Sequence, residues 1–81
     1  MSTFPEKRSV ATKVEWLVSH FRRPIDVPDI VLCARNVYGC NMAPASVRTA
    51  LRNLVKRGVL LEVARETYLY AEYAEDEDGY F

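Results

Sequence analysis

The chain has 81 residues and a composition, 49% hydrophobic and 27% charged, that is typical of one folded globular domain. These values exclude several domains and disorder along the whole length, and the net charge of zero excludes a uniform polycation. No apolar run is long enough to cross a bilayer and no secretory signal is visible, so we expect a cytoplasmic protein with no membrane partner.

The first predicted element is a helix that follows a short arm. Residues 1–8 show no periodicity, and we expect them to form a flexible arm. Ser9 is a suitable N-cap for a helix that runs to about Phe21. The apolar stripe of this helix consists of Val10, Val14, Leu17, Val18 and Phe21.

Trp16 does not belong to that stripe. It projects from nearly the opposite side of the predicted helix, and an exposed tryptophan requires a partner. Two partners remain open: Trp16 packs on the arm or the C-terminal segment, or it forms a contact in a homodimer.

A second helix is predicted after a short extended piece at Ile25. Pro24 ends the first helix, because proline disfavours helical geometry at the residue before it. Asp26 and Pro28 open the second helix and Gly39 ends it. The expected buried side consists of Ile30, Ala34, Val37 and Tyr38.

The third predicted helix, residues 44–57, has two different sides. Pro44 fits its first turn, whereas Ala43, in the cap position, offers no side-chain acceptor. At about 100° per residue, the apolar side carries Val47, Ala50, Leu51, Leu54 and Val55. The opposite side, which we call the outer face, carries Ala45, Arg48, Thr49, Arg52, Asn53 and Lys56. One side is suited to burial and the other to an anionic ligand.

Charge is segregated along the chain. Residues 31–60 contain no Asp or Glu. The cations of this stretch are Arg35, Arg48, Arg52, Lys56 and Arg57. Acids gather instead in residues 75–78. This pattern predicts one positive surface and an acidic tail, residues 74–81, that is either mobile or docked on a basic face.

The segment before the tail is predicted to form a hairpin. Residues 59–64 and 67–73 are rich in β-branched, aromatic and leucine residues. The connection, Arg65-Glu66, has no Gly or Asn, so we expect a loop somewhat longer than two residues. Tyrosines of the second run can stack on bases, but at strand spacing we favour packing on the helices. These are Tyr68, Tyr70 and Tyr73.

This order of helices, tight turn and hairpin resembles the winged-helix fold. The residues that carry the likeness most specifically are 42–54, M-A-P-A-S-V-R-T-A-L-R-N-L, and 57–60, R-G-V-L. They are similar to the turn and third helix of bacterial winged-helix regulators of the GntR and related types. The resemblance implies a mainly α fold over residues 9–73, with three helices and a two-stranded wing, whose third helix enters the major groove of double-stranded DNA.

The resemblance also assigns roles to the outer face. Near the helix start, small and polar side chains meet thymine methyls or hydrogen-bond to bases, and Arg48 or Arg52 reads guanine through two parallel donors. Lys56 and Arg57 lie further along and suit phosphates, while the wing offers only one cation, Arg65. The DNA-binding candidates are Ala45, Ser46, Arg48, Thr49, Arg52, Asn53, Lys56, Arg57 and Arg65.

Two functional hypotheses follow. The first is a small transcriptional regulator that binds DNA as a dimer on a two-fold site. The alternative is a protein-interaction module on the same fold, such as an antirepressor, an adaptor or an inhibitor. The neutral total charge favours the alternative, as does the acidic tail, which can bind a basic partner or fold back over the outer face.

Patterns for catalysis and metal binding are missing from the sequence. His20, Cys33 and Cys40 do not have the spacing of zinc ligands, and Cys33 lies beside the buried stripe of its helix, where an apolar thiol is ordinary. There is no nucleophile–base pair and no glycine loop for phosphate. We therefore expect no enzyme activity, no metal and no cofactor, and we expect reduced cysteines.

Overall fold

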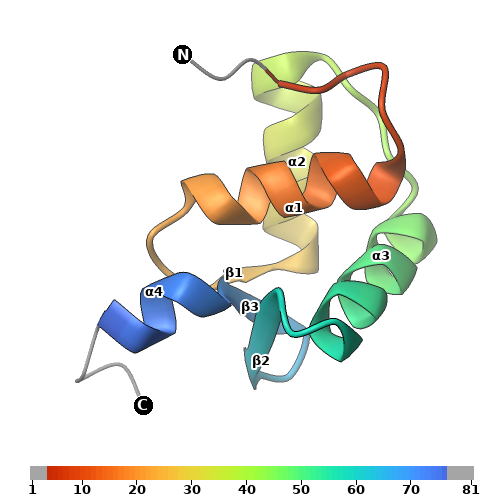
Figure 1. Cartoon of the computed structure of the whole chain (residues 1–81). Helices are drawn as coiled ribbons and strands as arrows, with labels where there is room; N and C mark the ends of the chain where they lie inside the picture. Colours follow the sequence, from red (N-terminus) through yellow and green to blue (C-terminus); the bar gives the residue numbers. More distant parts are fainter. Residues whose placement is uncertain (1–3, 77–81) are drawn as a thin grey trace.

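The computed structural model describes the backbone of residues 4–76 and the side chains of residues 4–73. Within this range there are four helices and three strands (Figure 1). In chain order they are α1 (Val10–His20), β1 (Ile25–Asp26), α2 (Val27–Tyr38), α3 (Pro44–Lys56), β2 (Leu60–Ala64), β3 (Thr67–Tyr70) and α4 (Ala71–Asp76). The chain is therefore mainly helical, with one small antiparallel sheet.

Local signals set the ends of the helices, as the sequence predicts. The Ser9 side chain accepts from the Thr12 N–H at 3.3 Å and caps α1. The Asp26 side chain accepts from the Asp29 N–H at 3.0 Å and caps α2. Gly39 ends α2 with a left-handed φ of 66°, a conformation that glycine adopts without strain. Ala43 leaves α3 without a side-chain cap.

The sheet has three strands in the order β1-β3-β2, all antiparallel. The prediction of a two-stranded wing is therefore incomplete. The extended piece at Ile25 pairs with Tyr68 and adds a third strand to the hairpin. This pairing joins residues that are far apart in the sequence, and a two-residue strand has no periodicity from which it can be predicted.

The hairpin turn is shorter than predicted. β2 ends at Ala64 and β3 begins at Thr67, so only Arg65 and Glu66 connect the strands. A bulge between Glu62 and Ala64 shifts the register, and Glu66 takes the positive φ, 53°, that a Gly or Asn usually supplies. The prediction of a longer loop was wrong because the bulge and the positive φ of Glu66 let the chain reverse within two residues, although neither of them is Gly or Asn.

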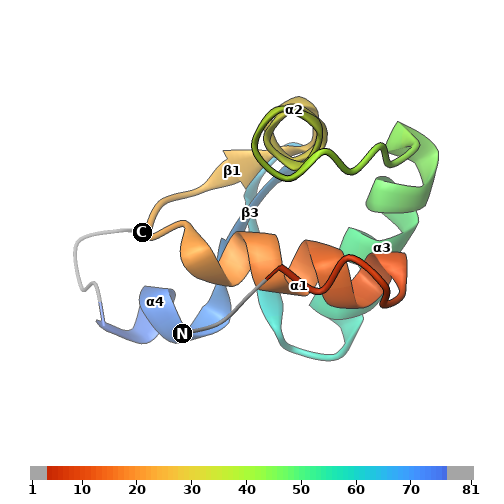
Figure 2. The same cartoon turned by 90° about the horizontal axis from the view of Figure 1, so that it is seen from above.

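The hydrophobic core lies between α1, α2, α3 and the sheet (Figure 2). Every one of these elements contributes at least one leucine or isoleucine with almost no exposed surface, including Ile25 of β1, which is 2% exposed. The others are Leu17, Ile30, Leu51, Leu54, Leu60 and Leu69. The predicted apolar side of α3 is buried as expected, with only Val55 half-exposed.

The buried side of α2 differs from the prediction at one residue. Val37 is 66% exposed. The buried stripe is centred on Val27, Ile30 and Ala34, and Tyr38, not Val37, continues it in the last turn. Val37 and the 43% exposed Leu32 thus lie on the solvent side of the helix.

The C-terminal part of the described chain is helical where a strand and a tail were predicted. β3 stops at Tyr70, and α4 begins at the next residue. Tyr73, on α4, donates its hydroxyl to the Ser19 carbonyl, and the Arg22 guanidinium lies 5.2 Å from the centre of its ring. These contacts place α4 beside the end of α1, at the opposite end of the domain from α3 (Figures 1 and 2). The rest of the predicted tail, residues 77–81, lies outside the described residues.

Candidate functional site

The outer face of α3 is the candidate site, and its side chains are presented to solvent. The predicted contact residues of α3 are all exposed: Ala45, Ser46, Arg48, Thr49, Arg52, Asn53, Lys56 and Arg57. They are held there by the opposite side of the helix, where Val47, Leu51 and Leu54 have no exposed surface. The amphipathic pattern therefore fixes the rotation of α3 about its axis.

One flank of this outer face is a shallow open groove beside the start of α1. Its volume is about 520 Å³. The groove is lined by Ser9, Val10, Ala11, Ala45, Ser46, Thr49, Ala50 and Asn53. The Thr49 hydroxyl donates to the Ala45 carbonyl at 3.1 Å, so its proton is used within the helix. Small side chains on this flank allow a ligand to approach the α3 backbone closely.

The other flank faces the hairpin and has mixed charge. A smaller pocket of about 190 Å³ lies here, lined by Arg48, Arg52, Val55, Glu62, Glu66 and Tyr68. Two guanidinium groups from α3 thus meet two carboxylates from the hairpin. The positive charge of the outer face is partly compensated on this side.

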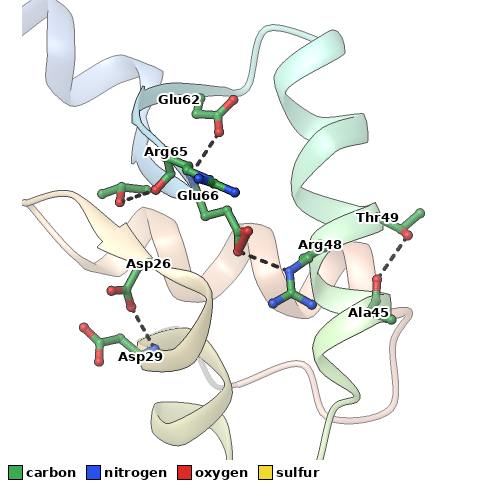
Figure 3. Close-up of polar contacts among 9 residues, drawn as sticks. Asp26, Asp29, Ala45, Arg48, Thr49, Glu62, Arg65 and Glu66 are labelled. Carbon is green, nitrogen blue, oxygen red and sulfur yellow. Dashed lines mark hydrogen bonds and ion pairs between the residues drawn. The ribbon is translucent and has the colours of Figure 1, made fainter.

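One ion pair joins the hairpin turn to α3. Glu66 Oε1 lies 3.2 Å from Arg48 Nε, which donates to it (Figure 3). The two side chains are 46% and 43% exposed. An exposed pair of this kind stabilises a fold by about 0–1 kcal/mol, so its effect is on the direction of the Arg48 side chain more than on stability.

The remaining cations of the site have no ion-pair partner among the described side chains, although Arg52 shares the pocket with Glu62 and Glu66. Among the side chains of residues 4–73, Arg52, Lys56, Arg57 and Arg65 form no ion pair. Arg65 is exposed in the hairpin turn and comes from a different element than the row of cations on α3. The structure therefore brings the predicted residues of α3 together on one face, whereas Arg65 lies in the hairpin turn.

Sequence reasoning missed Glu62 and Glu66 as part of this site. Glu66 lies 18 residues after Arg48 in the sequence, and the register of the hairpin decides whether they meet. The only signal was that the predicted connection carries a carboxylate, Glu66, directly after its one cation, Arg65.

Tyr68 is buried beneath the same flank. Only 7% of its surface is exposed. Burial raises the pKa of its phenol, the Glu62 and Glu66 carboxylates raise it further, and the Arg52 and Arg48 guanidiniums partly oppose them. Tyr68 belongs to the core, and Tyr70 packs against that core and also contacts Tyr73 of α4, with 5.4 Å between ring centres.

Trp16 packs against the arm. Its ring meets Phe4 edge-on at 5.4 Å and Tyr38 at 5.4 Å, and it stacks on His20 at 3.9 Å between ring centres. Phe4 also stacks on Tyr38 at 4.6 Å. The arm therefore supplies the partner that this side chain requires, and a dimer contact through Trp16 stays a prediction.

Other chemistry finds little support in residues 4–76. Burial raises the pKa of the Cys33 thiol, which makes it less reactive, and Cys33 and Cys40 are both free. Within this range no group of His, Cys, Asp or Glu is arranged to hold a metal ion. None of its helices combines the length and apolar character needed to cross a membrane.

Comparison with models of protein families, with curated proteins and with solved structures found no match. The functional interpretation therefore depends on the geometry of the outer face of α3.

Proposed function

We propose that the protein is a small sequence-specific DNA-binding regulator of transcription with a winged-helix architecture. In this proposal α3 enters the major groove of duplex DNA and the β2–β3 hairpin is the wing. The observation that carries the proposal is the outer face of α3, where cations without an ion-pair partner among the described side chains stand beside small and polar side chains on an exposed helix.

The dimensions of α3 suit a major groove. A helix of 13 residues is about 20 Å long at 1.5 Å per residue, and the groove, about 12 Å wide, admits one helix. Arg48, Arg52 and Lys56 recur every four residues, so they form a row along the exposed side. Arg48 and Arg52 lie nearer the helix start, where base edges are reached best, and Lys56 near the end suits a phosphate.

The hairpin has a different role from a wing that grips phosphates. Arg65 is its only cation, and Glu62 and Glu66 face α3. Carboxylates at this position repel the DNA backbone at short range. We therefore assign the DNA contacts to α3 and treat the hairpin as a support for that helix.

A binding titration with single-charge variants tests the proposal. Arg52→Ala and Lys56→Ala should each weaken binding of a duplex, and a variant that loses a phosphate contact should show a shallower salt dependence than the wild type, because it releases fewer counterions. Arg23→Ala is the matched control: it removes the same charge from the exposed link between α1 and β1, at the end of the domain away from α3. The proposal fails if the α3 variants bind duplex DNA as tightly as the wild type does. It also fails if Arg52→Ala and Lys56→Ala lose no more affinity than the control Arg23→Ala does.

The second candidate is a protein-interaction module that uses the same face of α3. The mixed charge of the hairpin flank favours it, because alternating guanidinium and carboxylate groups suit a protein surface better than a uniform line of phosphates. A chain that binds no duplex at low salt, with or without residues 74–81, belongs to this class. Tail deletion that raises DNA affinity would instead indicate that the acids mask α3.

A further inference from the structure

We infer that Glu66 is a positioning residue whose carboxylate holds the Arg48 guanidinium ready to read a guanine in the major groove. This inference rests on the proposed DNA-binding function. It makes the hairpin turn a determinant of base preference although the turn itself need not touch a base.

The first argument is that the Glu66 carboxylate contacts only one of the three nitrogens of the Arg48 guanidinium. Glu66 Oε1 contacts Nε, the nitrogen nearest the aliphatic stem, at 3.2 Å. In Figure 3 the two terminal nitrogens lie beyond Nε, at the end of the side chain, and the contact drawn to Glu66 goes to Nε alone. A guanine is read by two parallel donors directed at its O6 and N7 atoms. The contact with Glu66 leaves such a pair of donors available.

The second argument is that hydrogen bonds hold the backbone of the turn from which the Glu66 side chain extends. The Glu66 N–H donates to the Glu62 Oε2 atom at 3.1 Å, and the Thr67 hydroxyl donates to the Arg65 carbonyl at 3.1 Å. The backbone of Glu66 is thus fixed between two strands, which limits the positions that its carboxylate can reach, whereas an exposed arginine alone samples many rotamers. A partner fixed in this way lowers the entropy that Arg48 loses on binding.

The third argument is the backbone of Glu66 itself. Its φ of 53° is left-handed, a conformation that disfavours residues with a side chain other than Asn or Asp. Gly or Asn at this position relieves the strain. Strain of this kind is tolerated where the side chain has a task, and the ion pair with Arg48 is the task that the structure shows.

An alternative effect of the same carboxylate is to mask Arg48 from DNA. Masking and positioning predict different changes in DNA affinity when the Glu66 carboxylate is removed. If the carboxylate masks Arg48, its removal raises affinity for every duplex alike. If it positions Arg48, its removal lowers the preference for one base pair and leaves the other base pairs unaffected.

The experiment measures affinities of Glu66→Ala and Glu66→Gly for the best duplex and for duplexes with one base pair changed. The expected result is a loss of roughly 3- to 30-fold in preference at a single guanine, a part of what one bidentate contact supplies. Arg48→Ala should lose preference at the same guanine, and the double variant should lose no more than Arg48→Ala alone. Glu66→Gln, which keeps an oxygen acceptor for Nε, should restore part of the preference.

Controls separate positioning from folding and from failure of the proposed function. Glu72→Ala removes an exposed carboxylate on α4 and should leave base preference unchanged. Glu66→Gly should keep or raise the melting temperature, because glycine tolerates the left-handed φ, so a lost preference cannot be attributed to unfolding. Unchanged base preference in the Glu66 variants, with or without a uniform rise in affinity, overturns the inference while DNA binding by the wild type stands. Absence of any duplex binding by the wild type overturns the proposed function, and this inference with it.

Discussion

The outer face of α3 and the hairpin turn lie side by side, but the positions of their side chains are determined in different ways. The side chains of α3 are placed by a helical period within one segment, and each predicted contact residue of that helix is exposed. The turn is placed by strand pairing, and its carboxylate meets a helix 18 residues away in the sequence. A helix face is therefore a local property, whereas the partner of that face is a tertiary one.

The two regions also differ in what they contribute to stability. α3 is anchored by Val47, Leu51 and Leu54, which are fully buried, and each such side chain contributes about 1.5–3 kcal/mol by burial. The pair formed by Arg48 and Glu66 is half-exposed and contributes far less. Substitutions beneath α3 should therefore lower the stability of the domain strongly, whereas substitutions at the turn should change binding more than stability.

The largest expected effect comes from the buried side of α3. Leu51→Ala should lower the free energy of unfolding by about 2–5 kcal/mol, because it leaves a cavity in the core. Chemical denaturation followed by circular dichroism measures the loss. Val55→Ala, at a half-exposed position on the same helix, is the control and should cost clearly less. Equal losses would show that the burial pattern does not govern the stability of α3.

A smaller effect is expected from the cations of the outer face, and it sharpens the comparison within α3. Arg52→Ala should cost about 1–3 kcal/mol in binding and relax the preference for one base pair. Lys56→Ala should weaken binding to all sequences alike and reduce the magnitude of the salt slope by about one. Affinities over a salt series for matched and altered duplexes distinguish the two. Identical profiles would contradict the assignment of base and phosphate roles.

A third effect concerns the packing of the arm on Trp16, which involves neither the outer face of α3 nor the hairpin turn. Phe4→Ala removes aromatic contacts with Trp16 and Tyr38, each worth about 0.5–1.5 kcal/mol beyond area burial. The Trp16 fluorescence should shift to longer wavelength as the ring becomes hydrated, and the unfolding free energy should fall modestly. DNA affinity should be unchanged. A spectrum identical to that of the wild type would mean that the arm does not cover Trp16.

The smallest effect is a pH dependence at the boundary between α3 and the hairpin. The pKa of Tyr68 is raised in the folded state above its ordinary value of 10.0, so the unfolded chain loses this proton first. The contribution of Tyr68 to stability is therefore complete below pH 10 and is lost as the pH rises through the folded pKa. Denaturation at alkaline pH should show this decline, and Tyr68→Phe should remove it. A decline of the same size in Tyr68→Phe would assign it to other groups.

Local rules account for the parts of the fold that the sequence predicts. Ser9, Asp26 and Gly39 mark helix ends because their capping chemistry involves only near neighbours. The apolar stripe of α3 is equally local. These signals suffice to place the helices and the outer face of the candidate site.

Three features that sequence reasoning missed depend on contacts between distant segments. β1 becomes a strand because Ile25 meets Tyr68, and α4 lies against α1 through Tyr73 and Ser19. Glu66 adopts a left-handed φ despite its side chain and contacts Arg48. No pattern within any one of these segments contains that information.

The most direct test of the central claim is a selection of duplexes bound by the wild-type chain from a random pool at moderate salt. If α3 reads the major groove, the bound duplexes converge on a short motif, and the Arg52→Ala chain recovers a motif that is relaxed at one base pair. Recovery of no duplex, even when the selection is repeated at low salt, would contradict the claim that the outer face of α3 binds DNA.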